Sequence, residues 1–211
     1  MSADLKATLS ARCDEIISRH DLLGHPFYVE WTEGKLPVPA LRDYAREYGA
    51  FIATIGQGWA TIGDSEAAQV EDEHARVWER TFAAELDAGV GATRVAEVEN
   101  LVNVARELFS EKTSALGALY AFEAQQPQTA RTKLQGLREH YSHIPASCGE
   151  YFRLHCDDYG ESTLLGRKLD ELDSGEQQRA LDACGLMSRA LYGALTGIHA
   201  PFAIPATSVQ E

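Results

Sequence analysis

The chain has 211 residues, of which 45% are hydrophobic and 24% are charged, and its formal net charge is −13. This length suits one hydrophobic core, and the negative charge would repel nucleic-acid phosphates and anionic membrane surfaces. No apolar run reaches the roughly 20 residues of a membrane-spanning helix, and the polar N-terminus lacks the pattern of a secretory signal. We therefore expect a cytoplasmic protein that acts on small molecules, with neither nucleic acid nor membrane as a partner.

Apolar residues recur at a period near 3.6 along most of the chain, which predicts an all-α fold, a single compact bundle of about seven or eight helices. Residues 1–200 form the predicted domain, and the tail 201–211, with its prolines, is expected to fray. The predicted helices cover about residues 5–20, 27–33, 40–62, 65–86, 93–108, 110–141 with a kink or restart at Pro127, 145–160 and 174–198.

Polar residues of known capping preference precede several of these helices. Asp64 or Ser65 is expected to begin the helix over 65–86, and Ser110 the helix over 110–141 that bears Glu123. Ser174, with Gln177 three residues later, has the form of a capping box at the start of the last helix.

The four cysteines show no spacing typical of a structural zinc site or a redox pair. We expect free thiols, because disulfides are rare in reducing compartments. These cysteines are Cys13, Cys148, Cys156 and Cys184.

Four ionisable residues lie on helical faces that are otherwise apolar. Glu71 and His74 are spaced i,i+3, Glu123 lies within ALGALYAFE, and His155 lies within EYFRLH. Each residue alone could be a satisfied core residue, but bundle metal sites are built from inward-facing Glu and i,i+3 Glu/His pairs. Oxygen and imidazole ligands without sulfur favour iron or manganese.

Tyrosines are a second feature of the chain, which has eight of them. Tyr151 precedes His155 by four residues, so the two rings are neighbours on one helical face. Tyrosine also fills helical cores and forms hydrogen bonds at their rims, so a structural role stays open for each of them. Lys133, on the stretch after Glu123, could equally be a solvated surface lysine.

Three segments resemble the signatures of the haem-oxygenase-like family, which includes TenA, pyrroloquinoline-quinone synthase and the non-haem di-iron oxidases. The likeness is greatest to the 4-aminobenzoate synthases, such as the Chlamydia protein associating with death domains. It runs from about Leu22 to Ile198. The segments are HPFYVEWTEGKLPVPALRDYAREY at 25–48, ALYAFEAQQPQTARTKLQGLREHY at 118–141 and YFRLH at 151–155.

The resemblance implies a haem-oxygenase-like fold, assembly into a homodimer, and metal ligands at Glu71, His74, Glu123 and His155. Two further family ligands, an Asp and a His, would fall on Tyr159 and Ser162 in this chain. Asp158 and Glu161 each come one residue early, about 100° away on an undistorted helix. A one-metal site, a degraded site and a second site repaired by Asp158 or Glu161 all stay open.

The resemblance also implies oxidation with dioxygen and a reductant at iron or manganese. Tyr28 corresponds to a tyrosine that is cut from the chain and converted to 4-aminobenzoate for folate synthesis. Lys133 corresponds to its amino donor, and Tyr44 and Tyr151 correspond to nearby tyrosines. Two alternatives remain: an oxidase that acts on an external small molecule, and a catalytically degraded bundle that binds a ligand or partner.

Overall fold

The computed structural model describes residues 7–203, which form helices joined by turns and loops, with no strand among them. The predicted all-α class is confirmed. The α-helices are α1 (Leu9–Ser18), α2 (Pro26–Thr32), α3 (Val38–Ile52), α4 (Ile55–Thr61), α5 (Ser65–Trp78), α6 (Ala96–Leu108), α7 (Lys112–Glu123), α8 (Gln126–His140), α9 (Glu150–His155), α10 (Gly160–Asp170) and α11 (Ser174–His199). A π-helix, η1 (Glu79–Ala83), continues α5, and a 3₁₀ helix, η2 (Ala146–Gly149), precedes α9.

The helices are more numerous than predicted because two long predicted helices are interrupted. The predicted helix over 40–62 breaks between α3 and α4, and the one over 110–141 restarts at α8. Pro127 lies in the first turn of α8, where its missing N–H leaves no helical hydrogen bond unmade. The predicted helix over 145–160 ends at His155, and α10 is a separate helix that the periodicity does not predict.

Side-chain caps confirm one predicted helix start and correct two others. Asp64 caps α5 by accepting a hydrogen bond from the N–H of Ala67 at 3.1 Å. The caps of α7 and α11 are Glu111 and Asp173, and each lies one residue from the predicted serine. A carboxylate accepts backbone N–H groups more strongly than a hydroxyl does, which explains both shifts.

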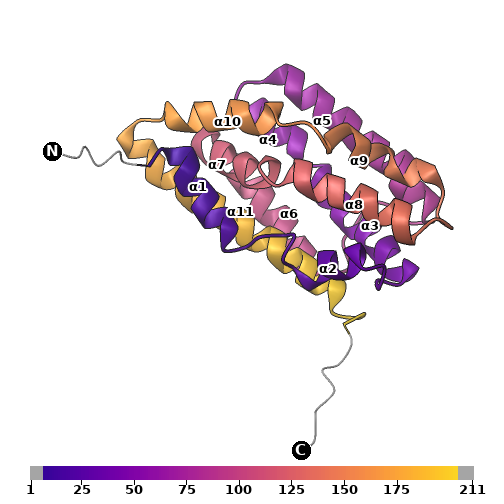
Figure 1. Cartoon of the computed structure of the whole chain (residues 1–211). Coiled ribbons are helices and arrows are strands. Elements are labelled where there is room, and N and C mark those ends of the chain that lie inside the picture. Colours follow the sequence, from indigo (N-terminus) through magenta and orange to yellow (C-terminus); the bar gives the residue numbers. More distant parts are fainter. Residues whose placement is uncertain (1–6, 204–211) are drawn as a thin grey trace, which may run out of the picture.

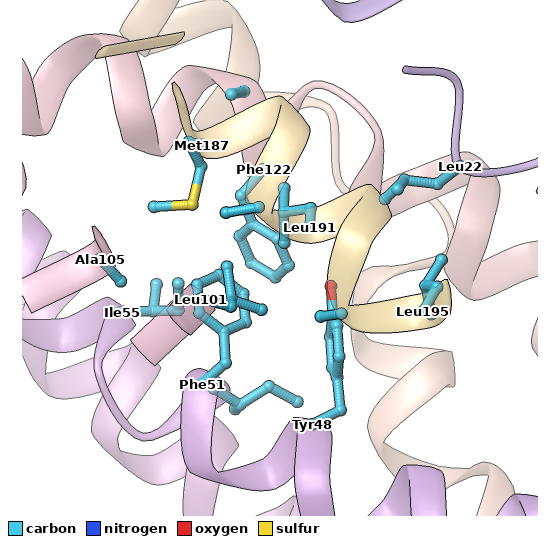
Figure 2. Packing of buried hydrophobic residues seen from close by; sticks show 14 of the residues in the cluster. Leu22, Tyr48, Phe51, Ile55, Leu101, Ala105, Phe122, Met187, Leu191 and Leu195 are labelled. Atoms are coloured by element: carbon cyan, nitrogen blue, oxygen red, sulfur yellow. The ribbon is translucent and has the colours of Figure 1, made fainter. Parts of the chain in front are cut away.

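The core lies between α11 and the helices that pack on it. Helix α11 contacts α6, α7 and α1, and Figure 1 shows it running along the length of the bundle. At Gly117 of α7, an added Cβ would lie 2.0 Å from the carbonyl oxygen of Ala180, so only glycine permits this close approach. Figure 2 shows the apolar packing of this core, with Leu191 of α11 near Phe122 of α7 and Phe51 of α3 near Leu101 of α6.

The helices that carry the ionisable residues lie close together. Helix α5 contacts α9, and α10 packs on α7. Figure 1 shows α5, α9 and α10 along one side of the bundle and α11 along the other. In the part of the chain that the structure describes, no helix is both long and apolar enough to cross a membrane.

The four cysteines are free thiols, as predicted. Of the predicted tail, residues 201–203 form a turn after α11. The remainder of the tail, and the start of the predicted first helix near Leu5, lie outside the described residues.

Candidate functional site

Glu71 and His74 lie one turn apart on α5 and face the interior. The Nδ1 atom of His74 lies 2.7 Å from Oε1 of Glu71, and the Glu71 side chain is almost fully buried. Burial opposes protonation of His74, but the hydrogen bond to Glu71 and the Glu71 charge outweigh it and raise the pKa of the imidazole. The predicted pair is therefore present on one face, with carboxylate and imidazole in direct contact.

His155 is the last residue of α9 and is 1% exposed. Its Nδ1 donates to the carbonyl oxygen of Tyr151 at 2.9 Å, which leaves Nε2 as the unprotonated nitrogen. Burial lowers the pKa of His155 to about 4, so the imidazole is neutral near pH 7. Within residues 7–203, Nε2 has no hydrogen-bond partner, and its ring lies 4.5 Å from that of His74 between centroids.

Glu123 is the last residue of α7 and is 2% exposed. Its Oε1 has no hydrogen-bond partner among the described residues, although Nε1 of Trp59 lies nearby, outside hydrogen-bonding geometry. Burial, followed by the charges of Glu161 and Glu71, holds the pKa of Glu123 well above its ordinary value. A buried carboxylate in these surroundings is poorly stabilised unless a cation joins it.

Potential ligand atoms of Glu71, His74 and His155 all lie within 4.8 Å of one another, which is close enough for one ion to reach all three. The orphaned Nε2 of His155 and Oε1 of Glu123 both need a partner that the described protein residues do not supply. Carboxylate oxygens and neutral imidazoles are donors suited to iron or manganese. The residues present therefore fit a bound metal ion. We call Glu71, His74, Glu123 and His155 the ligand cluster.

The chain after His155 leaves the helix and re-enters it in a different phase. Residues 156–159 are non-helical, and Oδ1 of Asp158 accepts the N–H of Gly160, the first residue of α10, at 2.9 Å. Tyr159 is 46% exposed, and the Ser162 hydroxyl donates to the Tyr159 carbonyl oxygen. The two positions that the resemblance marks for further ligands thus carry an exposed ring and a hydroxyl bonded to the backbone.

Asp158 and Glu161 differ in how they relate to the ligand cluster. Asp158 is exposed, and its charge still contributes to raising the pKa of His74. Glu161, in the first turn of α10, is half-buried, and its carboxyl group lies within hydrogen-bonding reach of Glu123. The chain break at 156–159 therefore brings Glu161 toward the ligand cluster, where an unbroken helix would turn it away.

Tyr28, Tyr44 and Lys133 come from α2, α3 and α8 and form a second buried group, the tyrosine–lysine cluster. The hydroxyl groups of Tyr28 and Tyr44 are 3.1 Å apart, and Nζ of Lys133 donates to the Tyr44 hydroxyl at 3.2 Å. Nζ also lies 5.4 Å from the centre of the Tyr28 ring. The structure brings these three predicted residues together.

Lys133 is 2% exposed, so the interpretation of it as a solvated surface lysine is wrong. Burial lowers its pKa to about 7. Among residues 7–203, no carboxylate forms an ion pair with the amine, and the rings of Tyr28, Tyr44 and Phe152 surround it. The lowered pKa therefore lets the Lys133 amine lose its proton near neutral pH.

Aromatic rings connect the two clusters. The ring of Tyr151 lies 4.3 Å from His155 and 4.9 Å from Trp78 between centroids, and the Trp78 ring lies 5.6 Å from that of Tyr44. Sequence reasoning did not single out Trp78, although its position four residues after His74 places it on the same helical face. Gln126, which donates to the Tyr151 hydroxyl at 3.0 Å, was also missed because nothing local marks it.

An all-α bundle whose neighbouring helices point carboxylates and imidazoles at one place belongs to the class of non-haem metalloproteins. The sequence pattern of the iron-containing redox enzymes matches residues 59–171, which are more than half of the chain. The chain belongs to this family of iron-containing redox enzymes. The predicted membership of the haem-oxygenase-like proteins is confirmed, and the family supports iron and oxidoreductase chemistry.

Individual relatives agree with this assignment. A 4-aminobenzoate synthase of Nitrosomonas europaea is 29% identical over 227 residues, covering 91% of each protein. One of Chlamydia pneumoniae is 30% identical over 165 residues, which are 67% of this chain and 72% of that protein. A solved structure of a TenA homologue from Pseudomonas syringae has a TM-score of 0.69 at 16% identity, covering 90% of each chain. That last likeness shows the fold alone.

Proposed function

We propose that this protein is a metal-dependent, dioxygen-activating oxidase that forms 4-aminobenzoate from its own Tyr28, for folate synthesis. The observation that carries the proposal is the burial of the Lys133 amine beside Tyr28, with no carboxylate partner for it among residues 7–203. A buried lysine is unfavourable for stability, so its presence among tyrosines supports a chemical use for the amine. The names of the relatives from Nitrosomonas europaea and Chlamydia pneumoniae support the same reaction.

The ligand cluster would hold iron or manganese. Glu71, Glu123, His74 and His155 are its proposed ligands, with Asp158 as a further candidate at the exposed edge of the site. The bound metal would supply the capacity to activate dioxygen, with electrons from a reductant. The protein keeps His155 neutral and oriented through the hydrogen bond from Nδ1 to the Tyr151 carbonyl, so that its second nitrogen is free to coordinate.

Lys133 would supply the nitrogen of the product: a C–N bond would form to the Tyr28 ring, the Cε–Nζ bond of the lysine would break, the phenol oxygen would leave as water, and dioxygen would be the oxidant. A pKa of about 7 leaves a large fraction of the amine unprotonated, and only the unprotonated nitrogen has a lone pair for attack. Tyr44 bridges the Lys133 amine and the Tyr28 hydroxyl by hydrogen bonds, so it holds the donor close to the ring that would receive the nitrogen. We assign Tyr44 a positioning role.

Tyr151 and Trp78 would let electrons pass between Tyr28 and the ligand cluster. Tyr28 does not contact a proposed ligand, whereas the rings of Tyr44, Trp78 and Tyr151 follow one another from Tyr28 to His155. Aromatic side chains in succession offer short steps for electron transfer. The predicted role of Tyr151 therefore fits its place beside His155.

Mass spectrometry of the intact protein, before and after incubation with iron, dioxygen and a reductant, tests the proposal. We expect the chain to lose both the side chain of Tyr28 and the Nζ nitrogen of Lys133, with 4-aminobenzoate in the filtrate. Lysine labelled with ¹⁵N should transfer its label to the product. Tyr159→Phe is the matched control, because Tyr159 is an exposed tyrosine outside the cluster.

Two outcomes would contradict the self-derived substrate. Product formation by Tyr28→Phe would indicate an external substrate. Protein that folds but binds neither iron nor manganese would favour a degraded, ligand-binding bundle. The homodimer and the use of manganese stay predictions, which light scattering and metal analysis of the purified protein would test.

A further inference from the structure

We propose that the pocket where α8 meets η2 and α9 binds a small carboxylate whose body is apolar and about the size of an aromatic ring. Arg138 and Arg153 hold the carboxylate, and apolar side chains of α8 and of the loop after it hold the body. The product of the proposed oxidase reaction is a molecule of this kind. The pocket lies outside both clusters, however, and binds such molecules whether or not the chain forms 4-aminobenzoate.

The pocket has a cavity of about 200 Å³ with an apolar floor. Helix α8 packs against both η2 and α9, and the loop between α8 and η2 lines the remaining side. The side chains of Leu134, Leu137 and Tyr141 are buried, and Ile144 is half-buried. In another protein a cavity of roughly 150 Å³ holds benzene, so this pocket has room for one aromatic ring.

The lack of a side chain at Gly149 keeps this space open. A Cβ added at Gly149 would lie 2.9 Å from Cδ1 of Leu134 and 3.0 Å from Nη1 of Arg153. The backbone φ of Gly149 is −84°, which any residue can adopt, so space and not backbone conformation favours glycine here. The Arg153 guanidinium therefore lies over the backbone of η2, at the edge of the apolar floor.

The two arginines lack the partners that other arginines of this acidic chain have. The chain has 32 acidic and 19 basic residues, and Arg76 and Arg80, for example, both pair with Glu73. Among residues 7–203, neither Arg138 nor Arg153 forms an ion pair, and no aspartate or glutamate lines the pocket.

The chemistry of the pocket selects the ligand class. The contact from Nη2 of Arg153 to the Ala146 carbonyl oxygen is long, at 3.5 Å, so it leaves most of the donor capacity of this guanidinium unused. Guanidinium groups bind carboxylates through paired hydrogen bonds, and an apolar floor binds the uncharged part of a ligand. An aromatic carboxylate combines both requirements in one small molecule.

The pocket and the tyrosine–lysine cluster share a wall made by α8 and α9. Leu134 directly follows Lys133 in α8, and Arg153 directly follows Phe152, whose ring lies 5.0 Å from the Lys133 amine. A carboxylate in the pocket is therefore separated by one layer of side chains from the place where the proposed reaction would form its product.

Titration of the full wild-type chain with benzoate, followed by NMR of ¹³C-labelled methyl groups, tests the pocket. We expect saturable shifts of the Leu134 and Ile144 methyl signals, with a dissociation constant in the millimolar range or below. Arg138→Gln and Arg153→Gln should each weaken binding about tenfold or more, because each removes a charged hydrogen-bond donor. The double variant should show no saturable shift, and 4-aminobenzoate should compete with benzoate in wild type.

Controls separate the pocket from general attraction to positive charge. Benzamide keeps the ring without the charge, and inorganic phosphate keeps the charge without the ring, so both should bind at least tenfold more weakly than benzoate. Arg106→Gln removes an exposed arginine of α6 and should bind benzoate like wild type. Gly149→Ala keeps both arginines but fills the space, so it should weaken binding too. Circular dichroism checks that each variant folds, and the substitutions at the exposed Arg138 and Arg153 suffice for the test if Gly149→Ala does not.

Three outcomes would overturn the pocket: no saturable shift in wild type, full affinity in the double variant, or benzamide or phosphate that binds as tightly as benzoate. Each of these leaves the oxidase proposal standing, because product formation is measured separately. Benzoate binding that is lost in the double variant, in protein that forms no 4-aminobenzoate, would support the pocket and contradict the proposed reaction.

Discussion

Carboxyl groups crowd together in the ligand cluster, whereas one amine lies among aromatic rings in the tyrosine–lysine cluster. Both places are buried, and in both the charged form is disfavoured by burial: the pKa of Glu123 rises and that of Lys133 falls to about 7. The two clusters differ in how the unfavourable energy of a buried charge is removed. Several convergent oxygens and nitrogens can share a cation, but an isolated amine surrounded by rings can only lose its proton.

The two clusters also differ in whether their polar groups have partners in the folded chain. The ligand cluster is incomplete without an ion, since Oε1 of Glu123 and Nε2 of His155 lack partners among the described residues. The tyrosine–lysine cluster is complete as folded, because hydrogen bonds already join Lys133, Tyr44 and Tyr28. Substitutions in one cluster should therefore leave the property of the other largely intact.

Lys133→Met gives the largest expected effect. It removes the proposed nitrogen donor, so 4-aminobenzoate should be absent from the filtrate, measured by chromatography and mass spectrometry. Metal content should stay at the wild-type level, because the Lys133 amine hydrogen-bonds to Tyr44 and lies against the Phe152 ring. Lys35→Met, at an exposed lysine paired with Glu33, is the control and should form product normally. Product from Lys133→Met would remove lysine from the reaction.

Glu123→Gln should weaken metal binding on the order of 100-fold or more, because a neutral amide replaces a charged ligand. Competition with a chelating dye would measure the affinity. The metal-free variant should be at least as stable as wild type, since a poorly solvated carboxyl group has been removed. A variant that keeps full metal affinity would exclude Glu123 as a ligand.

Product formation should increase with pH through about 7, roughly tenfold per pH unit below that value. The folded-state pKa of Lys133 lies below its ordinary value of 10.5, so the amine is charged below pH 7 and neutral above it. Burial raises the pKa of both Tyr28 and Tyr44, so these neighbours stay neutral across the range. Single-turnover rates between pH 6 and 8 would measure the profile, and a flat profile would contradict it.

The same pKa predicts how stability depends on pH. Between pH 7 and 10.5 the unfolded chain binds the Lys133 proton and the folded chain does not, so this group's unfavourable contribution shrinks as pH rises. The full contribution, present below pH 7, is roughly 5 kcal/mol. Lys133→Met should therefore raise the free energy of unfolding at pH 7 more than at pH 10, as measured by urea denaturation.

Trp78→Phe gives the smallest expected effect, a several-fold slower formation of product. It keeps an aromatic ring between Tyr151 and Tyr44 but removes the more easily oxidised indole, whose N–H donates to the Ala45 carbonyl oxygen at 2.8 Å. Metal content should be unchanged, which separates this variant from those of the ligand cluster. An unaltered rate, in a variant of normal stability, would remove Trp78 from the electron path.

Much of the ligand cluster could be predicted from local patterns. Glu71 and His74 share a face because 3.6 residues per turn bring positions i and i+3 together, and the structure places them in contact. Glu123 and His155 were recognisable as ionisable residues on apolar faces. Their positions in the bundle could not be read from periodicity, because they depend on the packing of α9 against α5 and of α7 against α4 and α10.

The sequence by itself determined the all-α class and the resemblance to a family, because periodicity and motifs carry them, and it was the resemblance that singled out Tyr28, Tyr44 and Lys133. Only the tertiary structure decided that Lys133 is buried and that Glu161 approaches Glu123. The burial of Lys133 depends on rings contributed by α2, α3 and α9, and the position of Glu161 depends on a turn that interrupts the helical phase. Neither is encoded within a single helix, so both depend on contacts between segments distant in the chain.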